Sequence, residues 1–170
     1  MPSLKSRLFI SLLRNRHLFK FHLKKDKWDW TTSIEKFRQD CINGAKKAGK
    51  IPDDITVTKI SIDRLPEGLS AEWIHPAGSE QTISQQTRLI FYTHGGGYVS
   101  GNCEDHRNVV AKLVKWCGIG ALLFDYRLAP EHPYPAALED ALTAYRWVLS
   151  QGVQPSKIAI MGESAGGGLC

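Results

Sequence analysis

Three short, nearly continuous apolar runs constrain the fold of this chain more than any other feature. They are RLIFYTH (88–94), GALLFDY (120–126) and KIAIMG (157–162). Apolar runs of this length are typical of strands buried on both faces, as in parallel sheets covered by helices. Helical patterns at 106–117 and 136–150 separate them, each long enough for a right-handed crossover. This β-α-β-α-β order predicts an α/β fold built on a mostly parallel sheet.

The preceding segment has a different pattern. ITVTKISID (55–63) alternates apolar and polar residues, as a half-buried strand does, and SAEWIH (70–75) continues the alternation. We expect these two segments to form an antiparallel hairpin. TTSIEKF (31–37) predicts the start of a helix that reaches about Ala48, opened by a capping box between Thr32 and Glu35.

Positive charge is concentrated at the N-terminus. The formal net charge is +5, but residues 1–27 carry +7 and residues 28–170 carry −2. Within residues 3–25 the apolar side chains follow one stripe, which indicates a basic amphipathic helix: Leu4, Leu8, Leu12, Phe19 and Leu23. A nucleic-acid-binding domain would spread basic and aromatic residues over its whole fold, so we expect no nucleic-acid partner.

Composition excludes several further classes of protein. The chain has 170 residues and 42% hydrophobic residues, which is enough for one domain with a real core. No apolar run is long enough to span a bilayer, and LFISLL (8–13) is too short for a secretory core, so we expect a cytoplasmic protein. None of the four cysteines forms a metal-ligand motif, so we expect reduced thiols and no metal.

GESAG (162–166) follows an apolar strand and opens a helix. A strand that turns abruptly into a helix lifts the serine at the turn above the sheet, where its hydroxyl can act as a nucleophile. The motif occurs easily by chance, and a glycine-rich turn would explain it alone; its place between strand and helix favours Ser164 as the nucleophile.

HGGGY (94–98) follows an earlier strand of the same sheet. Acyl transfer develops an oxyanion that needs backbone N–H donors, and consecutive glycines let the backbone approach it. The motif lacks the residues of a P-loop and the spacing of a dinucleotide fingerprint. We therefore predict an oxyanion hole formed by the N–H groups of Gly95 and Gly96 with that of Ala165.

With YRLAPEHPYPAALED (126–140) between them, the two motifs resemble those of the hormone-sensitive lipase family of α/β-hydrolases. The resemblance implies an α/β-hydrolase fold, hydrolysis of a small carboxylic ester through an acyl-serine at Ser164, and no cofactor. It divides the chain into a helical cap segment (1–50) and a hydrolase core (51–170) truncated after the nucleophile turn. His94, Gly97 and Glu163 are expected to support the site, with Glu163 orienting the loop where related sequences usually carry Asp.

The pattern departs from the family in one respect. The fold orders its triad Ser, then Asp or Glu, then His, whereas every His and acid here precedes Ser164. We therefore expect KIAIMG to lie mid-sheet in a longer protein, and negligible turnover by these 170 residues alone. A non-catalytic small-molecule-binding protein on the same scaffold is the alternative, as in the plant gibberellin receptors, and an amidase or deacetylase would share the machinery.

Other residues carry structural expectations. Arg127 and Glu131 are expected to pair across a proline-rich turn, and His106 to pack against the glycine loop. The basic N-terminal helix has three interpretations: part of a cap over the site, a loosely ordered tail, or a membrane-surface helix, of which we favour the cap. The oligomeric state is not predicted.

Overall fold

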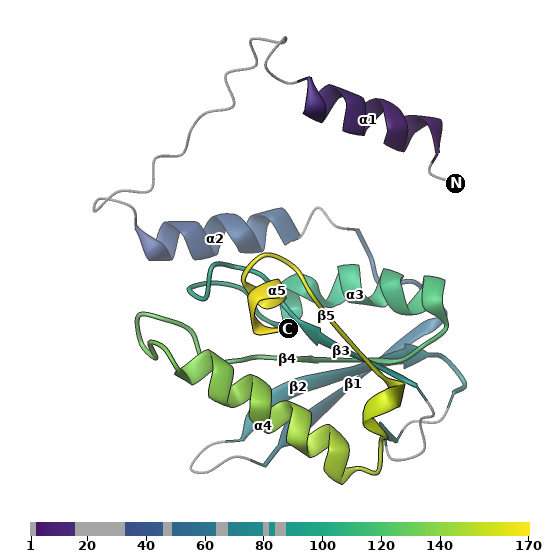
Figure 1. The fold of residues 1–170 in the computed structure, drawn as a ribbon, viewed down its shortest axis with the longest axis vertical. Coiled ribbons are helices and arrows are strands. Elements are labelled where there is room, and N and C mark those ends of the chain that lie inside the picture. Colours follow the sequence, from purple (N-terminus) through teal and green to yellow (C-terminus); the bar gives the residue numbers. More distant parts are fainter. Residues whose placement is uncertain (1–2, 16–32, 46–48, 64–67, 80–81, 84–87) are drawn as a thin grey trace. The chain divides into compact units, whose positions relative to one another are not determined.

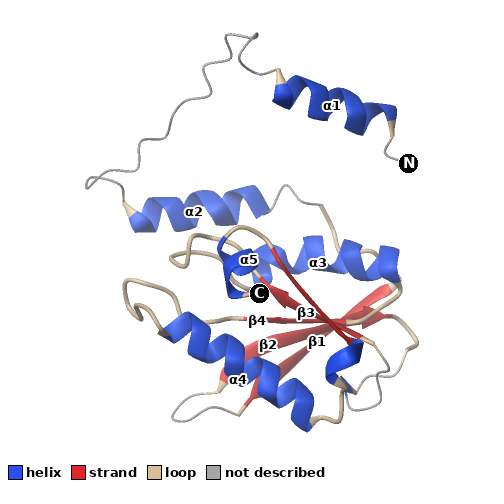
Figure 2. Cartoon of the chain, viewed as in Figure 1, coloured by secondary structure: helices blue, strands red, loops and turns tan. Residues whose placement is uncertain are grey.

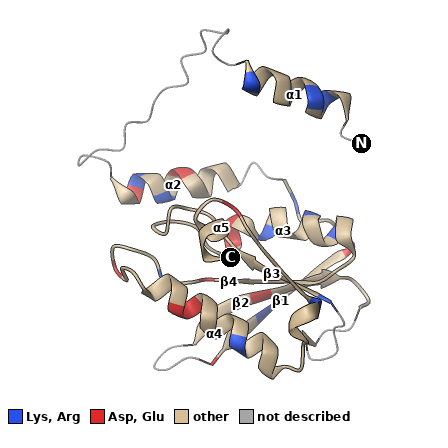
Figure 3. Cartoon of the chain, viewed as in Figure 1, with Lys and Arg blue, Asp and Glu red and all other residues tan. Residues whose placement is uncertain are grey.

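The computed structural model describes residues 3–15, 33–45, 49–63, 68–79, 82–83 and 88–170. Contacts divide the chain into two units, Met1–Thr32 and Ser33–Cys170. The first contains helix α1 (Leu4–Arg14), which carries Lys and Arg side chains (Figure 3). The predicted continuation of this helix through Phe19 and Leu23 lies outside the described residues, as does the cap residue Thr32. No helix of the described residues is long and apolar enough to cross a membrane.

Strands of the second unit form a five-stranded sheet in the order β1-β2-β4-β3-β5 (Figure 1). Their bounds are Ile55–Ile62 (β1), Leu69–Pro76 (β2), Leu89–Thr93 (β3), Ala121–Phe124 (β4) and Ile158–Gly162 (β5). β1 and β2 form the predicted antiparallel hairpin, and β2 is also antiparallel to β4. β3 pairs in parallel with β4 and with β5. The mixed sheet with a parallel centre confirms the predicted fold class.

The helices of the second unit are α2 (Ile34–Ala45), α3 (Cys103–Cys117), α4 (Ala136–Ser150) and α5 (Ala165–Leu169). A short 3-10 helix, Pro155–Lys157, precedes β5. α3 begins three residues before the predicted helix because Asn102 caps it, accepting a hydrogen bond from the Asp105 N–H at 2.8 Å. α2 begins after Ser33, whose hydroxyl accepts from the Lys36 N–H at 3.2 Å. Ser33 therefore caps α2, and the predicted capping box with Thr32 lies outside the described residues.

Helices α3 and α4 lie on opposite faces of the sheet (Figure 2). Side chains that alternate along the strands build two separate cores, one under α3 and one under α4. On one face Trp73 and Phe91 pack in the cluster that contains Ala144 and Val148 of α4. On the other, Ile90 packs in the cluster that contains the α3 side chains. α3 and α4 cover the faces of the sheet, and the loops that follow β3 and β5 lie at the carboxyl ends of these strands. Open α/β sheets bind their ligands at these ends.

At one edge of the described sheet lies β5, with its other neighbour position open. Ile160 and Met161 on this strand are 46% and 38% exposed. An open apolar edge of this kind is a template for pairing with another strand.

Candidate active site

Ser164 lies at a sharp turn between β5 and α5. Its backbone angles are φ 50° and ψ −120°, outside the regions that non-glycine residues normally adopt. Such strain persists only where the surrounding structure enforces it. The residue is exposed, while Ala165 and Gly166 behind it are buried. The turn thus presents the hydroxyl above the sheet, as the sequence predicts for a nucleophile.

Close backbone approach enforces this turn. A Cβ on Gly166 would lie 2.1 Å from the carbonyl oxygen of Thr93, so the residue must be glycine for α5 to meet β3. The Thr93 hydroxyl donates a hydrogen bond to the Gly166 carbonyl at 2.8 Å. The serine turn and the strand that leads into the glycine loop are therefore fixed to each other.

The glycine loop after β3 has a left-handed backbone. Gly96, Gly97 and Tyr98 have φ of 123°, 64° and 63°. The carbonyl of Gly96 accepts from the Ser100 N–H at 3.0 Å and from the Val99 N–H at 3.2 Å, which closes the loop as a turn. A Cβ on Gly96 would lie 2.0 Å from the Ser100 carbonyl oxygen. The loop is tight, and glycine is needed to close it.

The N–H groups of this loop differ in what they bind. Gly95 donates to Glu163 Oε1 at 3.1 Å, so its N–H is engaged by this carboxylate. That Gly95 contributes to the oxyanion hole therefore stays a prediction. The N–H groups of Gly96 and Gly97 make no hydrogen bond within the described chain, and neither does that of Ala165, the first residue of α5. These three N–H groups are free to donate to a ligand.

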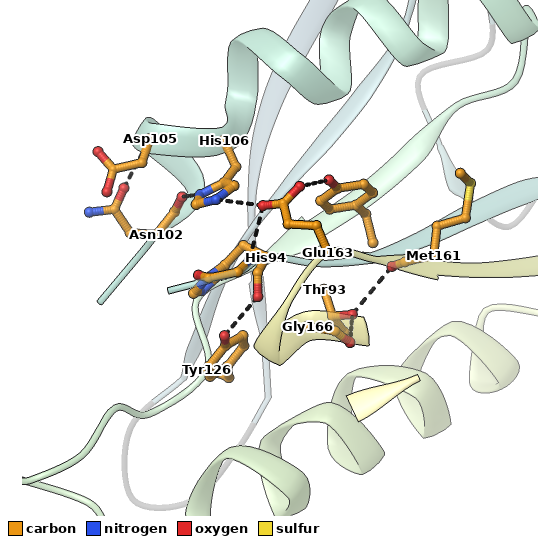
Figure 4. A network of polar contacts seen from close by, with 11 residues as sticks. Thr93, His94, Asn102, Asp105, His106, Tyr126, Met161, Glu163 and Gly166 are labelled. Atoms are coloured by element: carbon orange, nitrogen blue, oxygen red, sulfur yellow. Dashed lines mark hydrogen bonds and ion pairs between the residues drawn. The ribbon is translucent and has the colours of Figure 1, made fainter. Parts of the chain in front are cut away.

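Glu163 connects three segments around the site (Figure 4). Besides the Gly95 N–H, its carboxylate accepts from the Tyr92 hydroxyl at 2.5 Å and lies 2.8 Å from His106 Nε2. Nδ1 of His106 in turn hydrogen-bonds the Asn102 carbonyl at 3.1 Å. One carboxylate thus connects β3, the glycine loop and the start of α3.

These contacts shift the pKa values of both partners. The His106 hydrogen bond, with those from Tyr92 and Gly95, lowers the pKa of Glu163 to about 2, against the opposing effect of burial. Burial alone would lower the pKa of His106, but the hydrogen bonds to Glu163 and to the Asn102 carbonyl raise it. At neutral pH Glu163 is a carboxylate held by donors, which fits the orienting role and not that of a general acid.

His94 anchors the loop from inside. Its ring is fully buried, stacked between His106 and Tyr126 at centroid distances of 5.2 and 4.1 Å. Burial lowers the pKa of His94 to about 4, so the ring is neutral and its Nδ1 donates to the Gly95 carbonyl at 2.8 Å. The Tyr126 hydroxyl donates to the His94 carbonyl at 2.8 Å. The glycine loop is thereby fastened at its first two residues.

A cavity of about 360 Å³ contains Ser164, and α2 forms one wall of it. Its lining includes Gly95, Gly96 and Glu163 from the site and Cys41, Gly44, Ala45, Ser100, Gly101, Asp105, His106 and Val109 from the surrounding segments. No imidazole or carboxylate of the described chain hydrogen-bonds the Ser164 hydroxyl. The described residues also contain no group of three or more His, Cys, Asp or Glu that could hold a metal.

α2 is attached to this region by Arg38, which the sequence did not single out. Its guanidinium donates to the Val99 carbonyl at 2.6 Å, to the Ala129 carbonyl at 3.1 Å and to both carboxylate oxygens of Glu131. The predicted pairing of Arg127 with Glu131 is therefore wrong. Arg127 instead pairs with Asp140 and Glu139 of α4, because the turn between them points Glu131 toward α2. Contacts between residues 93 positions apart leave no pattern in the sequence.

Comparisons with known proteins agree with this arrangement. Residues 90–170 match a family model described as "alpha/beta hydrolase fold". An acetyl-hydrolase of Streptomyces hygroscopicus is 42% identical over 100 residues, covering 59% of this chain and 31% of the relative. A carboxylic ester hydrolase of Mycobacterium tuberculosis, LipN, is 38% identical over 120 residues, covering 68% of this chain and 31% of the relative.

Solved structures extend the likeness to nearly the whole chain. An esterase from the bacterial hormone-sensitive lipase family has a TM-score of 0.71 and 32% identity over 99% of this chain and 50% of its own. The solved structure of EstE5 has a TM-score of 0.71 and 37% identity, and the match covers 93% of this chain and 49% of EstE5. The chain thus spans about a third of these curated relatives and half of these solved structures.

Proposed function

Because the chain is an α/β-hydrolase of the hormone-sensitive lipase type, we propose that it carries the nucleophile and oxyanion hole of a serine carboxylic-ester hydrolase. The observation that supports this most directly is the strained Ser164, which shares one cavity with the glycine loop. The relatives named above include an acetyl-hydrolase, a carboxylic ester hydrolase and an esterase, which fits a small ester as the substrate.

In the proposed reaction the Ser164 hydroxyl attacks the ester carbonyl and gives its proton to a base. The tetrahedral oxyanion then accepts hydrogen bonds from the free N–H groups of Gly96, Gly97 and Ala165. Collapse of this intermediate breaks the bond to the alcohol, which leaves with the proton, and water hydrolyses the acyl-serine. Glu163 and His94 act on the loop geometry and make no contact with the reacting atoms.

Since no described imidazole or carboxylate hydrogen-bonds the Ser164 hydroxyl, we propose that another segment supplies the base and that these 170 residues alone turn over negligibly. A serine hydroxyl without a base is a weak nucleophile at neutral pH. We also propose that residues 1–50 belong to a cap, a role supported by Cys41 and Gly44 of α2 on the cavity wall.

A chimera tests both parts. The chain is joined to the part of EstE5 that it does not cover, and hydrolysis of p-nitrophenyl butyrate is followed. We expect turnover by the chimera, loss of that turnover on Ser164→Ala, and background rates for the unextended chain. A folded chimera without Ser164-dependent turnover would contradict the hydrolase and favour a binding protein on the same scaffold. Ser164-dependent turnover by the 170 residues alone would overturn the proposal that another segment supplies the base.

A further inference from the structure

A buried carboxylate without a partner lines the cavity that contains Ser164. Asp105 is 9% exposed and lies in the first turn of α3. Its backbone N–H donates to Asn102 Oδ1, but its carboxylate accepts no hydrogen bond from any residue that the structure describes. Its carboxylate oxygens are not fully enclosed, so they reach the cavity, and polar groups on a residue this buried normally have a partner.

Capping of α3 does not account for this carboxylate. Burial raises the pKa of the Asp105 carboxyl, against the opposing effect of His106, while the first turn of a helix favours a negative charge there. In a capping box, however, the side chain at this position would accept from the N–H of the cap residue. That reciprocal bond to Asn102 is not formed. The oxygen atoms of Asp105 are therefore left for another donor.

Asp105 lies where two cavities meet. The second cavity, of about 370 Å³, adjoins that of Ser164 and shares Ser100, Gly101 and Asp105 with it. Substrate that extends from the Ser164 cavity toward the second one must pass this carboxylate. The hydroxyl of Ser100, buried at the same junction, also has no hydrogen-bond partner in the described chain.

The other carboxylates on the walls of these two cavities already have basic partners. Glu163 pairs with His106 in the first cavity, and Glu131 pairs with Arg38 in the second. Asp105 is thus the one carboxylate of the described lining residues that retains its full capacity to accept hydrogen bonds. The local chemistry favours a group that donates hydrogen bonds and disfavours a second anion.

We propose that Asp105 forms a substrate subsite for a hydrogen-bond donor, and that the protein prefers esters whose chain ends in a primary ammonium or hydroxyl group. The subsite rests on the proposed function, since it assumes that the ester carbonyl lies at Ser164. An ammonium group binds more strongly than a hydroxyl because it brings a positive charge to the carboxylate. An apolar chain of the same length leaves the carboxylate unpaired.

Matched esters test this on the chain as it stands. Dissociation constants are measured at pH 7 from amide chemical shifts for 4-aminobutyl acetate, 4-hydroxybutyl acetate and pentyl acetate, which differ only in the terminal group. Ethyl 6-aminohexanoate and ethyl heptanoate form a second pair, in which the terminal amino or methyl group lies on the acyl chain instead of the alcohol chain. The five esters are titrated into the wild-type chain, into Asp105→Asn and into Glu104→Gln, a change at the exposed neighbouring acid.

For the amino ester of at least one pair we expect about tenfold tighter binding than for its apolar partner, the value of one charge-assisted hydrogen bond. The hydroxyl ester should lie between them. Asp105→Asn should remove the preference while leaving pentyl acetate binding unchanged, and Glu104→Gln should retain it. Since the wild-type ranking needs no variant, a poorly folded Asp105→Asn does not spoil the test.

Two results would overturn the subsite. Equal binding within both pairs, with shifts at the Gly96 and Gly97 amides, would refute it and leave the proposed function intact. If the preference for the amino ester survived in folded Asp105→Asn, the terminal ammonium would have to be bound by another group of the protein. If none of the esters moved the cavity amides, the subsite and ester binding by this chain would both be contradicted.

Discussion

Replacing Glu163 by Gln should produce a loss of stability that depends on pH. The wild-type carboxyl has a pKa of about 2, against 4.5 for the free group, a difference that corresponds to about 3 kcal/mol if fully expressed. The side chain is 44% exposed, so solvent screening reduces this figure, and we expect about 1–1.5 kcal/mol.

The sign follows from the two pKa shifts. Because folding lowers the pKa of Glu163, its contribution is present above pH 4.5 and is lost as the pH falls toward 2. Because folding raises the pKa of His106, its contribution is present below about pH 6.5 and is lost as the pH rises through the folded value. The pair should therefore contribute most between about pH 4.5 and 6.5, and Glu163→Gln should remove this maximum.

Urea unfolding from pH 3 to pH 8, followed by tryptophan fluorescence, measures the free energy of unfolding of both chains. We expect the two curves to lie apart near pH 5.5 and to move closer together by pH 3, with Glu104→Gln, a change at an exposed acid, following the wild type. A gap of equal size at pH 3 and pH 5.5 would refute the reasoning, because it would show that Glu163 stabilises by shape and not by charge.

Three further substitutions test the fold around the site. Gly120→Ala places a Cβ 2.1 Å from the Trp73 ring, so urea unfolding should show a loss of about 1–3 kcal/mol. Arg38→Ala should speed hydrogen exchange in α2 and leave exchange in α3 unchanged, since this residue bonds α2 to two loop carbonyls. Arg107→Met leaves Glu72, 3% exposed, as an unpaired buried charge and should cost about 3–5 kcal/mol, most of which Glu72→Gln in the same chain should restore.

Local patterns in the sequence predicted the elements that position the site. The runs at β3 and β4 are apolar because both faces of these strands are covered, and their composition alone predicts it. The run at β5 is also apolar, but its central residues are exposed in this structure. GESAG predicted the serine turn because only glycine allows the approach of Gly166 to Thr93. The predicted start of α3 is three residues late, because Asn102 caps the helix before its apolar pattern begins.

The sequence by itself determined the β-α-β-α-β order, the glycine loop and the serine turn, because each depends on backbone conformation and burial that neighbouring residues dictate. Only the tertiary structure decided which groups these motifs meet. It committed the Gly95 N–H to Glu163, paired Glu131 with Arg38 of α2, and left Asp105 buried without a donor. Such contacts join residues far apart in the chain, and hydrogen bonds and charges act through distance in space, which no local pattern records.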